Sequence, residues 1–109
     1  MSSDSVYHRV AHTKELPLRA THCVELLGRE ILLCHTAEGI FAVDNLCTHA
    51  AEKLQHGRLK GCKLFCPLHG ASFDVRNGAA LSRPAVKPLA SYPVKIQGAD
   101  ILVAVEFAQ

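Results

Sequence analysis

The stretch Cys66-Pro-Leu-His-Gly-Ala-Ser-Phe-Asp74 places a thiol and an imidazole three positions apart, directly before a glycine. A second pair lies upstream, at Cys47 and His49, so the pattern is C-x-H, sixteen intervening residues and C-x-x-H. Two short loops that each carry one thiolate and one imidazole can converge on a single metal centre. The candidate metal ligands are Cys47, His49, Cys66 and His69.

Two kinds of centre suit two cysteines and two histidines. A closed tetrahedral zinc site would be purely structural. Zinc sites more often take two Cys from one loop and two His from the other, whereas here each loop carries one of each. The mixed arrangement favours a [2Fe–2S] cluster with one iron on two thiolates and the other on two imidazoles. Zinc remains the alternative.

The composition is that of one small globular domain. The chain has 109 residues, of which 49% are hydrophobic and 20% charged. A domain of this size buries a modest fraction of its surface, so a metal site would help to stabilise it. The net charge of +2 and the lack of a basic run argue against nucleic-acid binding.

The cellular context follows from the cysteines and the N-terminal segment. No apolar run approaches the roughly 18 residues that span a bilayer, and the first residues carry no targeting signature. We therefore expect a cytoplasmic protein without membrane contact, in a compartment that keeps thiols reduced. Five cysteines, an odd number, then indicate metal binding rather than a disulfide framework.

The strand pattern predicts an all-β, antiparallel fold. Thr21–His35 resembles a hairpin that turns at Gly28-Arg29, and Gly39–Asp44 a further strand. Tyr92–Gln97 and Asp100–Val105 predict two strands that turn at Gly98-Ala99, and Asn77-Gly78 is a hairpin signal. Thr13–Leu16 predicts one helical turn. The middle, from about 45 to 88, is too long for a structureless loop, so something must organise it.

The two motifs resemble the cluster-binding boxes of Rieske proteins, and the resemblance to small Rieske ferredoxins extends over nearly the whole chain. It implies an antiparallel β-sandwich or barrel as a basal part, about 1–44 and 85–109, with an inserted cluster-binding subdomain, about 45–84. It implies one [2Fe–2S] cluster, with Cys47 and Cys66 on the inner iron and His49 and His69 on the outer iron. It also implies that Pro84 lies in a loop over the cluster.

The chain departs from the respiratory Rieske pattern at two kinds of position. Ala51 and Leu68 stand where those proteins have a disulfide, which cannot form here. Ala71 and Phe73 stand where those proteins have a Ser and a Tyr that donate hydrogen bonds to the cluster sulfurs. Without such donors the reduced cluster is stabilised less, so we expect a potential at the low end of the Rieske range, about −150 mV.

These features predict an electron carrier that has no catalytic site of its own. By the resemblance, a flavin-containing NAD(P)H-dependent reductase would supply one electron at a time, and a terminal oxygenase that hydroxylates aromatic rings would accept it. We expect a monomer. Two alternatives stay open: a small Rieske-like subunit of an assimilatory nitrite reductase, and a zinc-stabilised interaction module.

The sequence gives weaker indications about three further cysteines and about the charge distribution. Cys23, Cys34 and Cys62 are interpreted as ordinary thiols that pack in strands or turns. Residues 45–90 carry a balance of +5 while both flanks are slightly acidic. The cations between the two motifs could steer docking onto an acidic patch, or they could be an ordinary solvated surface; these are Lys53, Arg58, Lys60 and Lys63.

Overall fold

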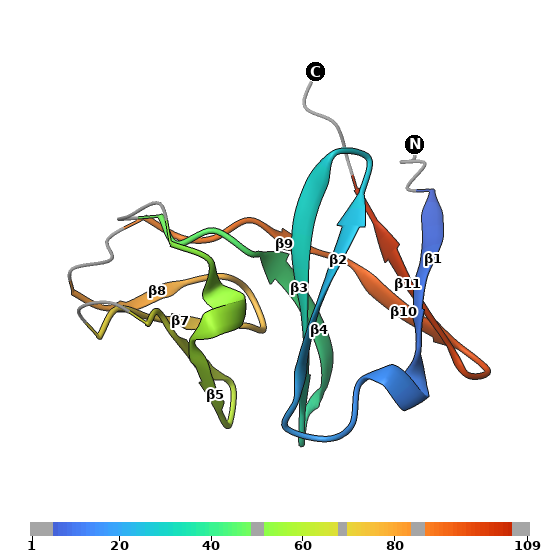
Figure 1. Ribbon diagram of the computed structural model, residues 1–109, viewed down its shortest axis with the longest axis horizontal. Coiled ribbons are helices and arrows are strands. Elements are labelled where there is room, and N and C mark those ends of the chain that lie inside the picture. The colour runs from blue at the N-terminus through green and yellow to red at the C-terminus, as the bar shows by residue number, and fades with distance from the viewer. Residues whose placement is uncertain (1–5, 49–51, 68–69, 84–86, 106–109) are drawn as a thin grey trace.

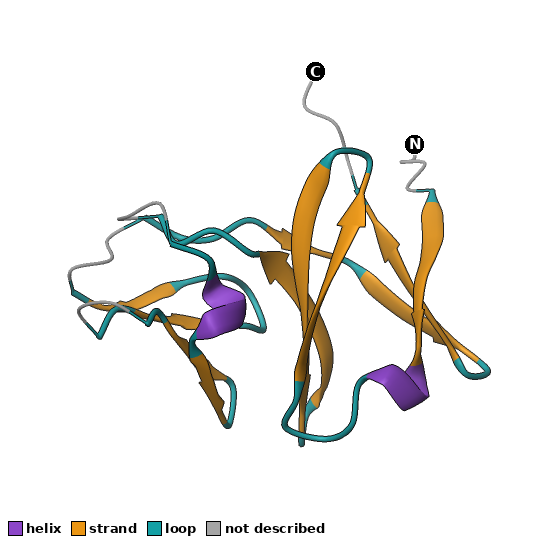
Figure 2. Cartoon of the chain, viewed as in Figure 1, coloured by secondary structure: helices purple, strands orange, loops and turns teal. Residues whose placement is uncertain are grey.

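The computed structural model describes residues 6–48, 52–67, 70–83 and 87–105. Within these ranges the chain forms eleven strands and two short 3₁₀ turns, which confirms the all-β prediction (Figure 2). All paired strands run antiparallel. They form three sheets, in the orders β1-β11-β10, β2-β3-β4-β9 and β5-β6-β7-β8. Figure 1 shows the third sheet set to one side of the other two.

The first sheet joins the two ends of the chain. It contains β1 (Tyr7–His12), β10 (Val94–Gln97) and β11 (Asp100–Ala104). The hairpin between β10 and β11 turns at Gly98-Ala99, as predicted, and Gly98 has a φ of 63° that suits glycine. The strand β1 was not predicted, because its sequence YHRVAH has only two aliphatic residues. A 3₁₀ turn, η1 (Thr13–Glu15), follows it at the predicted place.

The second sheet is built on a long hairpin. It contains β2 (Thr21–Leu26), β3 (Arg29–Thr36), β4 (Gly39–Asp44) and β9 (Ser91–Tyr92). The turn between β2 and β3 lies at Leu27-Gly28, one residue earlier than predicted. Both residues have positive φ, 53° and 81°, as in the tight turns that suit the twist of a hairpin. Leu27 is an unusual residue for that backbone region, which is why the sequence did not reveal it.

Pro93 separates two strands that the sequence joined into one. The residues before it, β9, pair with β4 in the second sheet, and the residues after it, β10, pair with β11 in the first. Proline has no N–H to donate, so the ladder is interrupted there. The Pro93 carbonyl still accepts a hydrogen bond from the Ala104 N–H at 3.1 Å. The chain thus passes from one sheet to the other at this residue.

The third sheet organises the middle of the chain. It contains β5 (Arg58–Lys60), β6 (Lys63–Phe65), β7 (Ser72–Asp74) and β8 (Ala80–Ser82), and a second 3₁₀ turn, η2 (Leu54–His56), precedes it. The turn between β7 and β8 includes Asn77-Gly78, as predicted, and the Gly78 N–H donates to the Asp74 carbonyl at 2.6 Å. All four strands are short, which is why the periodicity of the sequence did not reveal them.

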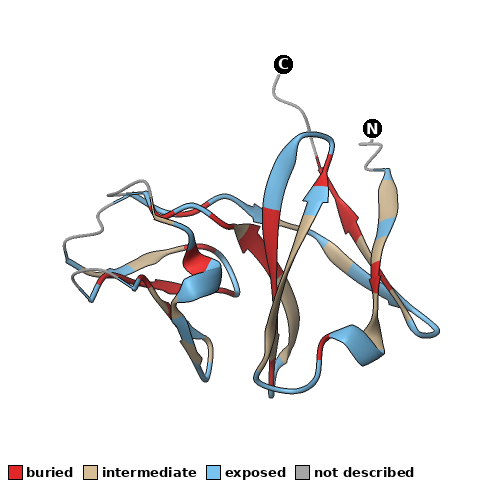
Figure 3. Cartoon of the chain, in the orientation of Figure 1, coloured by how far each residue is buried: buried red, intermediate tan, exposed pale blue. Residues whose placement is uncertain are grey.

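The strand β3 connects two apolar cores. Ile31 and Leu33 belong to a core shared with β1 and β11, whereas Leu32 and Cys34 belong to a core shared with the third sheet. All four side chains are fully buried (Figure 3). A strand covered on both faces is apolar throughout rather than alternating, which explains the run Ile-Leu-Leu-Cys. This shared strand fixes the third sheet to the rest of the molecule.

Candidate cluster-binding site

The structure places both predicted cysteine ligands after strand ends, in the apolar core that β3 shares with the third sheet. Cys47 and Cys66 are 3% and 4% exposed and belong to the same apolar cluster, together with Leu64, Ala71 and Phe73. Cys66 directly follows β6, whereas Cys47 follows the β4 end of the second sheet. His49 and His69 lie outside the described residues, as does Pro84. Of the four candidate metal ligands, the two that are described are thus buried cysteines in one apolar environment.

The two segments that follow these cysteines are closed in the same way. The Cys47 N–H donates to the Glu52 carbonyl at 2.9 Å, and the Cys66 N–H donates to the Ala71 carbonyl at 2.8 Å. Each bond spans five residues, although the histidine spacing differs between the motifs. We call residues 47–52 the first ligand loop and residues 66–71 the second ligand loop. Each loop is therefore closed at its base by a main-chain hydrogen bond from the cysteine that begins it.

A buried amide holds the base of the first ligand loop. Asn45 is 1% exposed, and its side-chain Oδ1 accepts the Gln55 N–H at 2.8 Å. Its Nδ2 donates to Gln55 Oε1 at 2.6 Å, to Glu30 Oε1 at 3.2 Å and to Cys23 Sγ at 3.4 Å. Hydrogen bonds from Lys53 and then from Asn45 lower the pKa of Glu30. The network ties both flanks of the loop to β2 and β3.

Two serines hold the second ligand loop. Ser82 Oγ donates to the Gly70 carbonyl at 3.1 Å and lies 2.7 Å from Ser72 Oγ. Because the Ser82 proton is used on Gly70, Ser72 must be the donor in the serine pair. Ser72 is 2% exposed and faces Ser82 directly across the β7–β8 ladder. Its hydroxyl, whose direction the sequence left open, is therefore directed to β8.

A third contact joins the first ligand loop to the segment after β8. Thr48 Oγ1 donates to the Lys87 carbonyl at 2.8 Å. The neighbouring Leu89 is anchored in turn, because its N–H donates to the Gly78 carbonyl at 2.7 Å. The part of this segment around Lys87 and Leu89 is thus held by both the first ligand loop and the β7–β8 turn.

The positions that bear hydroxyls in respiratory Rieske proteins are apolar and tightly packed here. Ala71 and Phe73 are both fully buried in the core that contains Cys47 and Cys66. The hydroxyls of Ser72 and Thr48 are directed to Ser82 and to the Lys87 carbonyl. Two buried thiols on pinned loops in an apolar pocket suit an iron–sulfur group, whose sulfurs need few polar partners.

The remaining cysteines are placed as ordinary thiols. Cys34 is fully buried in β3, and burial raises the pKa of its thiol to about 12. Burial also raises the pKa of Cys23. Cys62 lies in the β5–β6 turn, at the opposite end of β6 from Cys66, and its Sγ donates to Thr36 Oγ1 at 3.6 Å. Among the described residues, no group of three or more His, Cys, Asp or Glu side chains could hold a metal ion.

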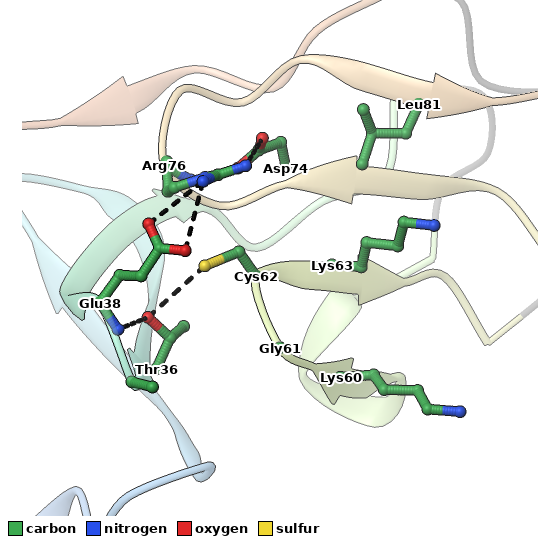
Figure 4. Close-up of a pocket in the computed structure, with 10 residues that line it drawn as sticks. Thr36, Glu38, Lys60, Gly61, Cys62, Lys63, Asp74, Arg76 and Leu81 are labelled. Carbon is green, nitrogen blue, oxygen red and sulfur yellow. Dashed lines mark hydrogen bonds and ion pairs between the residues drawn. The ribbon is translucent and has the colours of Figure 1, made fainter.

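A pocket at the junction of the second and third sheets contains a charged clamp. Arg76 donates to Asp74 at 2.9 Å and to Glu38 at 3.1 Å, so it joins the β7–β8 turn to the β3–β4 turn (Figure 4). The hydrogen bond from Arg76 is the largest cause of the lowered pKa of Asp74. The Cys62 contact to Thr36 crosses the same junction. These contacts fix the orientation of the third sheet far from the ligand loops.

The structure divides the four cations that the sequence placed near the cluster. Lys60 and Lys63 are opposite each other at the turn end of the β5–β6 hairpin, whereas Arg58 is opposite Phe65 at the end that leads to Cys66. Lys63 and Cys66 are three positions apart along the strand, which is about 10 Å. Lys53 is near the first ligand loop but forms an ion pair with Glu30 at 3.0 Å. Of the four cations, Arg58 thus lies nearest to Cys66 along the strands and forms no ion pair with a described residue, and the steering role stays a prediction.

Comparison with known proteins identifies the family. The Rieske [2Fe-2S] domain family matches residues 6–93. A Ralstonia protein, the ferredoxin component of naphthalene 1,2-dioxygenase/salicylate 5-hydroxylase systems, is 42% identical over 83 residues, 76% of this chain and 80% of its own length. The 3-phenylpropionate/cinnamic acid dioxygenase ferredoxin subunit of Photorhabdus laumondii is 38% identical over 101 residues, 92% of this chain and 95% of its own.

A solved structure agrees with these relatives. The ferredoxin of carbazole 1,9a-dioxygenase from Nocardioides aromaticivorans IC177 superposes with a TM-score of 0.88 at 34% identity, and the match covers 94% of this chain and 100% of the other. No helix in the described part of the chain is long and apolar enough to cross a membrane. The resemblance read from the two motifs is thus confirmed along most of the sequence: the chain belongs to the Rieske [2Fe-2S] domain family, and its cofactor is one [2Fe–2S] cluster.

Proposed function

We propose that this protein is the ferredoxin component of a dioxygenase system that hydroxylates aromatic rings. It accepts one electron from a flavin-containing NAD(P)H-dependent reductase and passes it to the terminal oxygenase, which performs the chemistry. The observation that carries this proposal is the pair of buried cysteines, Cys47 and Cys66, on two pinned loops of a chain whose relatives are ferredoxin components over most of their length. The reductase places it in the cytoplasm, where NAD(P)H is available.

The ligand set we propose is Cys47 and Cys66 as thiolates on one iron and His49 and His69 as imidazoles on the other. The cluster supplies a site that takes up and releases one electron. The chain's own residues hold the ligands in place. The main-chain hydrogen bonds that close the two loops fix the cysteines, and the side chains of Asn45, Ser82 and Thr48 hold the loops. We also propose the division predicted from the sequence, with residues of about 45–84 as a cluster-binding subdomain on a basal part.

A low potential follows from the packing around the cysteines. Ala71 and Phe73 offer no hydroxyl, and the Ser72 hydroxyl is used by Ser82. With few donors to stabilise the more negative reduced state, we expect a value near the low end of the Rieske range, about −150 mV. Such a carrier is suited to electrons from NAD(P)H.

The test is spectroscopic first and functional second. The purified protein should be brown-red, contain two irons and acid-labile sulfide, and give a rhombic EPR signal after reduction. Colourless protein with one tightly held zinc would refute the proposal. Reduced protein mixed with an aromatic-ring dioxygenase from the same gene neighbourhood should be reoxidised in the presence of substrate and oxygen. A nitrite reductase in that neighbourhood, with no transfer to any oxygenase, would instead favour the alternative role.

A further inference from the structure

Three cations of the third sheet and its C-terminal segment stand beside the ligand loops. Arg83 follows Ser82, whose hydroxyl donates to Gly70 in the second ligand loop at 3.1 Å. The Lys87 carbonyl accepts the hydrogen bond from Thr48 in the first ligand loop at 2.8 Å. Arg58 is opposite Phe65, which directly precedes Cys66. Of these three, only Arg58 lies between the two motifs, whereas Arg83 and Lys87 lie beyond the second.

These three side chains are exposed and have no counter-charge among the described residues. Neither an ion pair nor a side-chain hydrogen bond to another described residue is found for any of them. Three other cations, Arg9, Lys53 and Arg76, are each held by a carboxylate at 2.8 to 3.1 Å. Among described residues adjoining the ligand loops, Glu52 is the one acid outside an ion pair. The described residues around the loops therefore carry a net positive charge.

Exposed apolar residues lie between these charges. Leu46, which precedes Cys47, is 52% exposed, and Pro67, which follows Cys66, is also exposed. A small apolar centre with a charged rim is the usual composition of a transient protein interface. Both residues adjoin cysteines that we propose as ligands, so a protein that covers them approaches the cluster closely.

We propose that Arg58, Arg83 and Lys87 form a cationic docking patch that receives an acidic surface of the terminal oxygenase. This inference rests on the proposed function and names the chemistry of its partner. Opposite charges on the two surfaces increase the rate of productive encounters, and the increase falls with ionic strength. The patch acts by placing the oxygenase over Leu46 and Pro67, the exposed neighbours of Cys47 and Cys66.

The chain offers a matched control for the charges. Lys60 and Lys63 are also exposed and also lack an ion pair with a described residue, but they line the junction pocket at the far end of the hairpin (Figure 4). In that view both side chains extend away from the Glu38–Arg76 clamp. The double variants Arg83→Glu/Lys87→Glu and Lys60→Glu/Lys63→Glu change the net charge by the same amount. They differ only in where the charge is reversed.

The experiment measures electron transfer from reduced holoprotein to the oxygenase by stopped flow, at several salt concentrations. Affinity of the oxidised protein for the oxygenase and the reduction potential of each variant are measured as well. Wild-type transfer should slow as salt increases. Reversal at 83 and 87 should slow transfer at low salt roughly tenfold, the low end of the range for electrostatic steering, and weaken binding, with a flatter salt dependence. Charge reversal at 60 and 63 should change the transfer rate and the affinity for the oxygenase by less than about twofold each.

Three other results overturn the inference. Equal effects of the two double variants would show that net charge, not the patch, controls the encounter, and wild-type transfer that is insensitive to salt would show that charge has no part in it. Faster transfer after reversal at 83 and 87 would show a basic partner surface. A wild-type protein that transfers no electron to the oxygenase would refute the proposed function itself. That outcome is seen with the wild-type protein alone, so it is distinct from failure of the docking patch.

Discussion

Asn45 and Gln55 hydrogen-bond each other twice across the base of the first ligand loop. The Asn45 Oδ1 accepts the main-chain N–H of Gln55 at 2.8 Å, and the Asn45 Nδ2 donates to the side-chain Oε1 of Gln55 at 2.6 Å. The same Nδ2 faces the carboxylate of Glu30. The side chain at position 45 must therefore both donate and accept hydrogen bonds. Ionised aspartate, which has nearly the same shape, can only accept them.

We predict that Asn45→Asp destabilises the protein and loosens the cluster. The introduced carboxylate would face Glu30 and Gln55 Oε1 as a second acceptor, and a buried network broken in this way costs about 2 kcal/mol. The deficit should shrink at acidic pH, because a protonated carboxyl can donate again. Free energy of unfolding and iron content, each measured from pH 5 to pH 8, check this.

The control for that variant is Asn77→Asp. Asn77 accepts from the Ala79 N–H at 2.9 Å in an exposed turn, and a carboxylate serves there equally well. A deficit that is as large for Asn77→Asp as for Asn45→Asp would contradict the role given to the buried amide.

Restoring the missing hydroxyls should raise the reduction potential. Ala71→Ser and Phe73→Tyr each place a donor where respiratory Rieske proteins have one. Each should raise the potential by roughly 59 mV, a factor of ten in the electron-transfer equilibrium. Protein-film voltammetry measures this directly. Ser72→Ala is the matched control, because that hydroxyl donates to Ser82 and should leave the potential almost unchanged.

Gly57 is predicted to be intolerant of any side chain. A Cβ at this position would lie 1.8 Å from the Phe65 carbonyl oxygen, next to Cys66, although the backbone φ of −88° is ordinary. Gly57→Ala should therefore displace β6 and lower both stability and cluster content. Gly61→Ala, in open space with a φ of +61°, should cost only the left-handed backbone penalty of about 1–2 kcal/mol. Thermal unfolding that ranks Gly61→Ala as the worse variant would contradict the steric argument.

The Arg76 clamp should make stability depend on pH. The pKa of Asp74 is lowered mainly by its hydrogen bond from Arg76, so this contribution is present above the pKa of an unfolded aspartate and is lost as pH falls through the lower folded value. Arg76→Gln should lower the free energy of unfolding at pH 7, and the difference from wild type should vanish in acid. Denaturant titrations from pH 7 down to pH 2 test this; a difference that does not shrink as pH falls would point to packing instead.

The sequence predicted the fold class and the cofactor, whereas it predicted less of the scaffold around the proposed ligands. Cys47 and Cys66 stood out as candidate ligands because metal chemistry restricts residue type and spacing. Strands such as β4 and β11 were recognisable from their apolar residues, whereas Pro93 and Leu27 show what local patterns miss: which sheet a strand joins, and which residue adopts an unusual backbone conformation. Asn45 and Ser82 carried no signal, since their role depends on partners distant in the sequence, such as Glu30 and Gly70.

The pairing of β1 with β11 has a practical consequence. Tyr7 is opposite Ala104, so the chain enters and leaves the fold at neighbouring points, on the opposite side of the molecule from β5 to β8 (Figure 1). Anything attached through either terminus, whether a fused protein or an electrode surface, would extend from that side. A tethered ferredoxin of this kind would keep its redox-active end pointing outward, as a wired bioelectrode requires.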